Sequence, residues 1–183
     1  HRFGSKFDAF IFESEAGEAG EKIVRENTPK VFTESEGAVV YEGESKGLHT
    51  RVFINKEGYP TYEAKDVGLL SLKFGKYNPD ISLFVTDDQQ AEYFKVVVSA
   101  AGEIHPEWKE KTIHRTHGRM SFKGAKMSSR LGNVPLATDI LDTVHDEALT
   151  RMQEKNSVLA DQISLSALKF TILKTAAGKN INF

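Results

Sequence analysis

The sequence predicts an α/β fold in which parallel strands are flanked by helices, and three observations support this class. Residues 81–86, ISLFVT, form a continuous apolar run, which is typical of a strand buried on both faces of a parallel sheet. A helical pattern of apolar residues stands on each side of this run. A second strand-like run, TIHRTHG at 112–118, follows the second helical pattern. The order helix, strand, helix, strand, loop, helix is that of a doubly wound domain.

The first part of the chain predicts a surface helix and a β-hairpin. Residues 18–27 are mostly polar and carry a helical pattern, which indicates a helix on the surface. Residues 38–41 and 50–54 are short β-rich runs, and the segment between them contains glycine. This arrangement favours a hairpin with a long turn.

The helix before the apolar run is expected to be about four turns long, because its apolar residues recur at helical spacing. Gly58 and Pro60 mark a turn before it, and we expect Gly75 and Pro79 to end it. The apolar face comprises Ala64, Val67, Leu70 and Phe74.

The later elements are predicted in the same way. Residues 88–101 form a helix that should end before Gly102, and Thr138 is expected to cap a further helix. Residues 157–175 add one helix or two. The apolar positions are Ala91, Phe94, Val98 and Ala101 in the first helix, and Leu141, Val144 and Ala148 in the second.

Composition limits the classes of protein that this chain can represent. Its 183 residues are 39% hydrophobic and 27% charged, as in ordinary globular domains, and they suit one domain or a piece of a larger one. The chain has no cysteine, which excludes disulfides and thiolate chemistry and favours a cytoplasmic location. The net charge of −2 argues against non-specific coating of nucleic acid. The histidines show no spacing that suggests a metal site.

Residues 109–130 break the charge balance, since they hold seven Lys and Arg against one Glu. This region ends in the polar loop GAKMSSRLGNV, residues 124–134, which follows a predicted strand. Lys126 offers a point charge, Arg130 a planar fork and Ser128 a hydroxyl, which are groups that bind phosphate. The alternative is a solvated surface loop without a ligand. The loop does not have the spacing of a Walker phosphate loop.

The same residues carry a resemblance to a known family. KMSSR followed by GNV resembles the KMSKS signature loop of class I aminoacyl-tRNA synthetases, and MSSRLGNV is similar to its arginyl-tRNA synthetase version. Further segments resemble that family in the same order along the chain: FDAFIFESE, ESEGAVVY, PTYEAKDVGL, FVTDDQQAEYF and ALKFTILK. The resemblance implies the second half of a Rossmann-like (HUP-type) catalytic domain. It also implies ATP-dependent activation of arginine, and arginine, ATP and tRNA(Arg) as partners.

The resemblance implies that Tyr62, Asp66 and Gln90 bind arginine. Independently of the family, positions i and i+4 share one helix face, so Tyr62 and Asp66 can reach one ligand. A carboxylate suits a guanidinium as a bidentate partner. The alternatives are that Asp66 forms a surface pair with Lys65 or Lys73, and that Gln90 only caps its own helix.

The resemblance also implies residues that bind ATP and stabilise its reaction. His117, Gly118, Met120, Lys126 and Met127 would border the nucleotide, and Mg²⁺ would arrive with ATP rather than at a dedicated protein site. The catalytic group would comprise Lys126, Ser128 and Arg130. The chain departs from the general signature at Ser129, where lysine is usual. This departure leaves open whether Lys123, Lys126 or Arg130 stabilises the pyrophosphate.

The expected organisation has three parts. Residues 1–37 form a connecting helical segment, 38–156 form the second half of the catalytic domain, and 157–183 begin a following helical region. The HIGH-type motif of the family is absent, so the fragment alone is expected to be inactive. Two alternatives stay open: a class I synthetase of another amino-acid specificity, and a non-catalytic nucleotide- or RNA-binding module with this fold.

Overall fold

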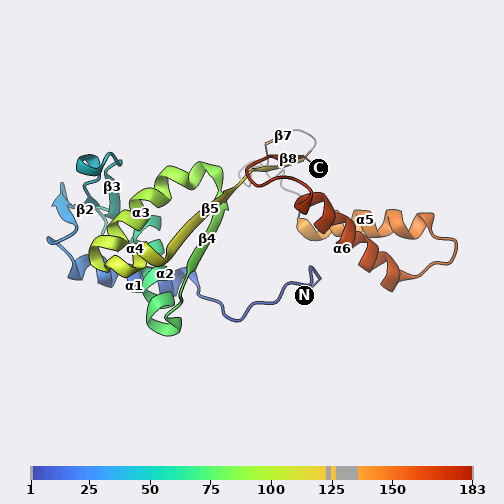
Figure 1. The fold of residues 1–183 in the computed structure, drawn as a ribbon, viewed down its shortest axis with the longest axis horizontal. Coiled ribbons are helices and arrows are strands. Elements are labelled where there is room, and N and C mark those ends of the chain that lie inside the picture. The colour runs from blue at the N-terminus through green and yellow to red at the C-terminus, as the bar shows by residue number, and fades with distance from the viewer. Residues whose placement is uncertain (1, 123–124, 127–135, 183) are drawn as a thin grey trace. The chain divides into compact units, whose positions relative to one another are not determined.

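The structure is a computed structural model that describes residues 2–122, 125–126 and 136–182. It divides into two compact units (Figure 1). The larger unit comprises Phe7–Thr116. The smaller unit combines the N-terminal residues up to Lys6 with the chain from His117 onward.

The larger unit begins with a helix pair and a small antiparallel sheet. Helix α1 (Glu13–Glu26) includes the predicted surface helix and extends it toward the N-terminus. Strands β1 (Thr33–Ser35), β2 (Ala38–Tyr41) and β3 (Arg51–Ile54) form the sheet in that order, with a 3₁₀ turn, η1 (Glu44–Lys46), between β2 and β3. The predicted hairpin is therefore confirmed, with one further strand on its edge.

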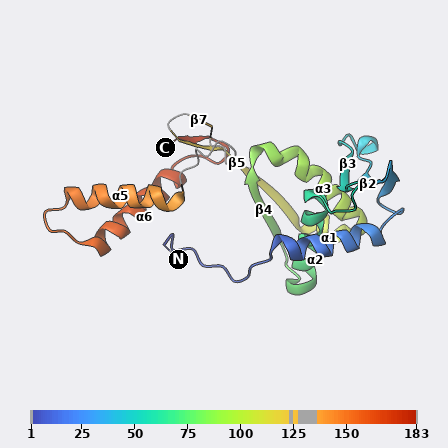
Figure 2. The ribbon, with the colours of Figure 1, turned by 180° about the vertical axis from the view of Figure 1, so that it is seen from behind.

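Helix α2 (Tyr62–Tyr77) lies against α1, and glycines make this contact possible (Figure 2). A Cβ on Gly20 of α1 would collide with the carbonyl oxygen of Ala64, and one on Gly68 of α2 would collide with that of Ala16. The four predicted apolar positions of α2 are all buried. Its predicted end is wrong for Gly75, which lies inside the helix, and right for Pro79, which directly follows the cap residue Asn78 at φ 41°.

The second half of the larger unit is a strand–helix–strand arrangement. Strand β4 (Ser82–Asp87) leads through η2 (Asp88–Gln90) into α3 (Ala91–Ile104), then α4 (Pro106–Lys111) and β5 (Thr112–His117). Strands β4 and β5 pair and run in the same direction (Figure 1). The expected α/β class with parallel strands is thus present in a small sheet.

Strand β4 corrects the expectation of burial on both faces. Ser82 and Phe84 are buried, whereas Leu83 and Val85 are 52% and 62% exposed. The buried face meets α2 and α3, since Lys73 donates to Ser82 and the Phe84 ring contacts Phe94. A continuous apolar run shows that both faces of a strand carry apolar side chains. Whether each face is buried depends on whether another element packs against it.

Helix α3 also differs from its prediction in detail. Its buried face includes Phe94 and Ala101 as predicted, but Val96 and Val97 are fully buried where Val98 is only partly so. The helix continues past Gly102 to Ile104. The buried face of α3 packs with α2, the two sheets of this unit and Trp108 of α4 into one core that is rich in aromatic side chains.

The smaller unit contains a helix pair and short strands. Strand β6 (Met120–Phe122) pairs antiparallel with β7 (Ala125–Lys126) and parallel with β8 (Ile181–Asn182). Helix α5 (Ala137–Arg151) packs against α6 (Ser157–Leu173). Thr138 is not the cap of α5: the cap position is Leu136, whose N–H donates to the Asp139 carboxylate at 3.2 Å.

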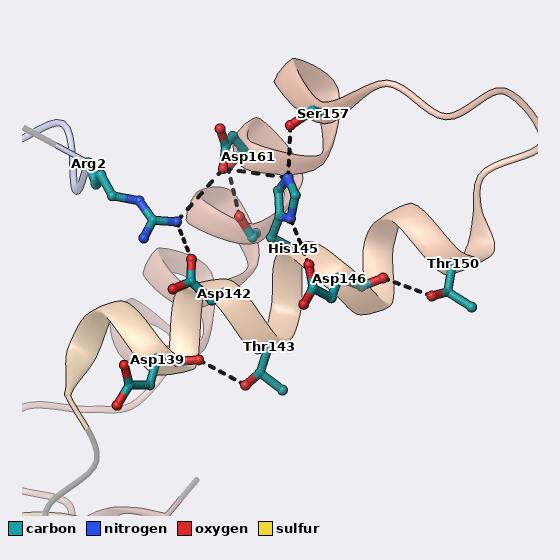
Figure 3. A network of polar contacts seen from close by, with 10 residues as sticks. Arg2, Asp139, Asp142, Thr143, His145, Asp146, Thr150, Ser157 and Asp161 are labelled. Atoms are coloured by element: carbon teal, nitrogen blue, oxygen red, sulfur yellow. Dashed lines mark hydrogen bonds and ion pairs between the residues drawn. The ribbon is translucent and has the colours of Figure 1, made fainter.

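Polar contacts connect the N-terminal segment to this helix pair (Figure 3). The Arg2 guanidinium lies 2.6 Å from an Asp142 carboxylate oxygen on α5 and 4.0 Å from one of Asp161 on α6. His145 of α5 lies within hydrogen-bond distance of Ser157 and of its neighbour Asp146. We call this set the Arg2 cluster.

Candidate functional site

A pocket of about 380 Å³ in the larger unit gathers polar side chains from four elements. Strand β3 contributes one residue, α2 three, η2 two and α3 one, because the start of α2 and the end of β4 lie on the same side of the unit. The lining residues are Arg51, Tyr62, Glu63, Asp66, Gln89, Gln90 and Tyr93.

Asp66 is the central carboxylate of this pocket. Its side chain is partly buried, and the Tyr93 hydroxyl donates a hydrogen bond to Oδ2 at 2.5 Å. Burial raises the pKa of Asp66, the Tyr93 hydrogen bond lowers it, and the nearby Glu63 carboxylate raises it, with burial the largest effect. Burial and the adjacent Asp66 charge likewise raise the pKa of Tyr93, so this hydroxyl remains a donor.

A second acidic side chain in the pocket is already paired. The Arg51 guanidinium binds the Glu63 carboxylate at 3.0 Å, and the two side chains are only 32% and 13% exposed. The Cζ atom of Arg51 also lies 5.3 Å from the centroid of the Tyr93 ring, which is a cation–π distance. One guanidinium and two carboxylates line the pocket, so one negative charge remains.

The structure brings the three predicted arginine-binding residues to this one pocket. Tyr62 and Asp66 lie one helical turn apart on α2, and Gln90 stands at the junction of η2 and α3. Tyr62 is 70% exposed and therefore accessible to a ligand.

The described part of the chain shows neither of the alternative roles, which were a lysine pair for Asp66 and helix capping for Gln90. Lys65 pairs with Glu13 at 2.5 Å, and Lys73 donates to Ser82 at 2.6 Å, so neither pairs with Asp66. Gln90 makes no side-chain capping hydrogen bond. Asp87 caps the preceding turn η2, where its carboxylate accepts from the Gln89 N–H at 2.9 Å.

Four lining residues were missed by sequence reasoning. Glu63 adjoins Tyr62, and Tyr93 follows Gln90 by three positions on a helix, so the sequence held a local signal for both. Gln89 is the direct neighbour of Gln90. Arg51 had no such signal, since only the fold brings β3 to α2.

The predicted ATP-binding residues belong to the smaller unit or lie outside the described residues. His117 and Gly118 line a second pocket, of about 520 Å³, together with the end of α6 and the segment after it. A Cβ on Gly118 would collide with the backbone of Lys179, which is a structural reason for glycine here. Met120 and Lys126 lie in β6 and β7, but only their backbone is described. Met127, Ser128 and Arg130 lie outside the described residues, as do Lys123 and Ser129.

The described residues offer neither a metal site of the usual kind nor a membrane-spanning helix. No group of three His, Cys, Asp or Glu side chains in this part of the chain is arranged to hold a metal ion. No helix in the described ranges combines the length and apolar character needed to cross a membrane.

Comparison with known proteins identifies relatives of the whole chain. Residues 7–177 match the sequence model of the family described as tRNA synthetases class I (R), catalytic domain. The chain is similar to an arginine–tRNA ligase of Bacteroides thetaiotaomicron, with 27% identity over all of this chain and 32% of that protein. It is also similar to an arginine–tRNA ligase of Clostridium perfringens, with 28% identity over 98% of this chain and 33% of that protein.

A solved structure shares the fold. An arginyl-tRNA synthetase of Thermus thermophilus superposes with a TM-score of 0.77 at 23% identity, covering all of this chain and 38% of that one. The chain thus spans about a third of the length of the curated relatives that it matches.

Proposed function

Because this chain belongs to the family of class I arginyl-type tRNA synthetase catalytic domains, we propose that it forms the arginine-binding part of an arginine–tRNA ligase. In this proposal it is the second half of a Rossmann-like (HUP-type) domain, divided at 1–37, 38–156 and 157–183. The observation that carries the proposal is the pocket in which Tyr62, Asp66 and Gln90 meet and one negative charge is left over.

The pocket chemistry suits a guanidinium ligand. Asp66 supplies an ionised carboxylate that a planar guanidinium can bind with two parallel hydrogen bonds, which a lysine ammonium cannot reproduce. Tyr62 and Gln90 supply neutral polar groups that orient the rest of the ligand. Since Arg51 neutralises Glu63, the ligand brings the charge that the pocket lacks.

The proposed reaction of the whole polypeptide has two steps. First, an oxygen of the arginine carboxylate attacks the α-phosphorus of ATP, which forms arginyl-adenylate and expels pyrophosphate. A hydroxyl of the terminal ribose of tRNA(Arg) then attacks the arginyl carbonyl carbon, gives up its proton, and displaces AMP. Both steps depend on positioning and on charge stabilisation, so no protein nucleophile is required.

The nucleotide would be bound by residues of the smaller unit and the signature loop. We assign His117, Gly118 and Met120 to the adenine and ribose side of ATP, and Lys126 and Met127 of the signature loop to ATP binding as well. Lys126, Ser128 and Arg130 would stabilise the negative charge that develops on the phosphates. Mg²⁺ would be held by the phosphates of ATP itself, and we place the activity in the cytoplasm.

Calorimetric titration of the chain with arginine and with lysine tests the arginine site. We expect arginine to bind and lysine to bind at least about tenfold more weakly, since only a guanidinium fits the carboxylate bidentately. Asp66→Asn should weaken arginine binding by about 1.5–3 kcal/mol, the usual contribution of a hydrogen bond to a charged group.

The matched control is Asp80→Asn, which removes the same charge from an exposed residue outside the pocket. This variant should bind arginine like the unaltered chain. Equal affinity for lysine would favour a synthetase of another specificity. Failure to bind either amino acid would favour the non-catalytic module.

A further inference from the structure

We infer that Tyr93 is a positioning residue for arginine recognition: its hydroxyl holds one oxygen of the Asp66 carboxylate and thereby turns the other toward the pocket. This inference rests on the proposed function, because it assigns a role within the same arginine site. Tyr93 acts on the ligand through Asp66, and it carries no charge of its own to the pocket.

The geometry of Tyr93 is fixed on more than one side. Its hydroxyl reaches Asp66 Oδ2 across the gap between α3 and α2 at 2.5 Å. Its ring meets the Phe94 ring edge-on with centroids 5.1 Å apart, and the Arg51 guanidinium lies against its face. A side chain restrained at ring and hydroxyl can hold the carboxylate of Asp66 in one rotamer.

The distribution of charge explains why a phenol suits this position. The charged groups that face Asp66 are Glu63, from its own helix, and Arg51, from β3. Arg51 is engaged by Glu63, and among the described residues no cation pairs with Asp66. A lysine at position 93 would orient Asp66 but would also neutralise it. A tyrosine orients the carboxylate and leaves its charge for the ligand.

The Tyr93 hydrogen bond also opposes the effect of burial. Burial raises the pKa of Asp66, and the hydrogen bond lowers it. Since a guanidinium binds the ionised carboxylate, arginine affinity falls as the pH falls through the pKa of Asp66. Removing the hydroxyl raises that pKa further, so affinity should be lost at a higher pH.

Tyr93→Phe tests the inference, because it removes one oxygen and keeps the ring. We expect arginine affinity at neutral pH to fall about fivefold, which is the size of effect expected from the loss of one hydrogen bond. We also expect the pH at which affinity is half lost to rise, together with the Asp66 pKa measured by ¹³C NMR of its carboxyl group. A merely structural role for Tyr93 would lower thermal stability and leave arginine affinity at neutral pH unchanged.

Tyr41→Phe is the matched control. Tyr41 is buried in the same unit, and its hydroxyl also donates to a carboxylate, that of Glu103, but it does not line the pocket. This variant should leave arginine affinity and its pH profile unchanged.

The outcomes separate the two proposals. Arginine binding by the unaltered chain, with the same affinity and pH midpoint in Tyr93→Phe, would overturn the inference and leave the proposed function standing. If the unaltered chain bound no arginine, the proposed function would fail and the inference with it. If Tyr93→Phe did not fold, NMR of the Tyr93 hydroxyl proton in the unaltered chain, without arginine and with saturating arginine, would decide. A Tyr93 hydroxyl proton that stays hydrogen-bonded in both states supports the inference, and its loss on binding contradicts it.

Discussion

At the scale of single residues, the pocket is defined by which charges are paired and which are not. Glu63 and Asp66 stand one helical turn apart on α2, yet only Glu63 has a cationic partner among the described residues. The difference arises from β3, which places the Arg51 guanidinium in an ion pair with Glu63 and not with Asp66. The pocket therefore depends on Arg51 as much as on the carboxylate that would meet the ligand.

The Arg51–Glu63 pair should contribute measurably to stability. Arg51→Met leaves the nearly buried Glu63 carboxylate without its partner and should lower the free energy of unfolding by about 1–3 kcal/mol. Urea denaturation would measure the loss. Lys56→Met is the control, because Lys56 and Glu36 form an exposed pair, 62% and 84% accessible, that should contribute about 0–1 kcal/mol. Equal losses in the two variants would contradict this assignment.

At the scale of helices and strands, the sequence predicted the existence of elements better than their ends. The apolar spacing of α2 predicted its buried face correctly, because burial of a stripe leaves a local periodic signal. Gly75 did not end the helix as predicted, because with open space around it this glycine is tolerated inside the helix, whereas Asn78, just before Pro79, adopts the left-handed conformation. Glycine therefore did not mark the boundary that it usually marks.

The site shows the same division between local and non-local information. Tyr62, Asp66 and Gln90 were predicted from short motifs, which are local in sequence, and the fold brings them to one pocket. Arg51 could not be predicted, since its contact with Glu63 requires the hairpin and α2 to be packed first. Exposure of Leu83 was missed for a related reason: no local pattern reports whether a second layer covers β4.

Replacing a glycine by alanine should have opposite effects inside and outside the contact between α1 and α2. Gly20→Ala should destabilise the chain by more than about 2 kcal/mol, because the new methyl would collide with backbone at Ala64 and the helices must separate. Gly75→Ala should instead stabilise it by about 0.5–1 kcal/mol, since it lies in α2 with nothing near its Cβ position. Thermal unfolding of both variants would measure this. Similar effects of the two substitutions would contradict the packing.

At the scale of the whole molecule, the two units differ in how much core they contain. Almost every buried apolar side chain in the described ranges belongs to the larger unit. In the described part of the smaller unit, only Leu141 and Ala160 are buried apolar residues. The Arg2–Asp142 ion pair of that unit is 46% and 58% exposed, so it adds little to make up for the small core.

Hydrogen exchange should report this difference. Amides of α5 and α6 should exchange faster than those of α2 and α3, because helices with few buried contacts open at lower free energy. Mass spectrometry of peptides from the two helix pairs would measure the rates. Equal protection of the two pairs would show that the smaller unit is more cohesive than its burial indicates.

The Arg2 cluster also constrains the order of events during synthesis on the ribosome. Arg2 and Asp142 are 140 positions apart, and the entire larger unit lies between them in the chain. The buried core of the larger unit draws on residues that all precede α5 in the chain, so it does not need α5. The Arg2 contacts form only after both α5 and α6 have been synthesised, although Arg2 precedes the whole larger unit in the chain.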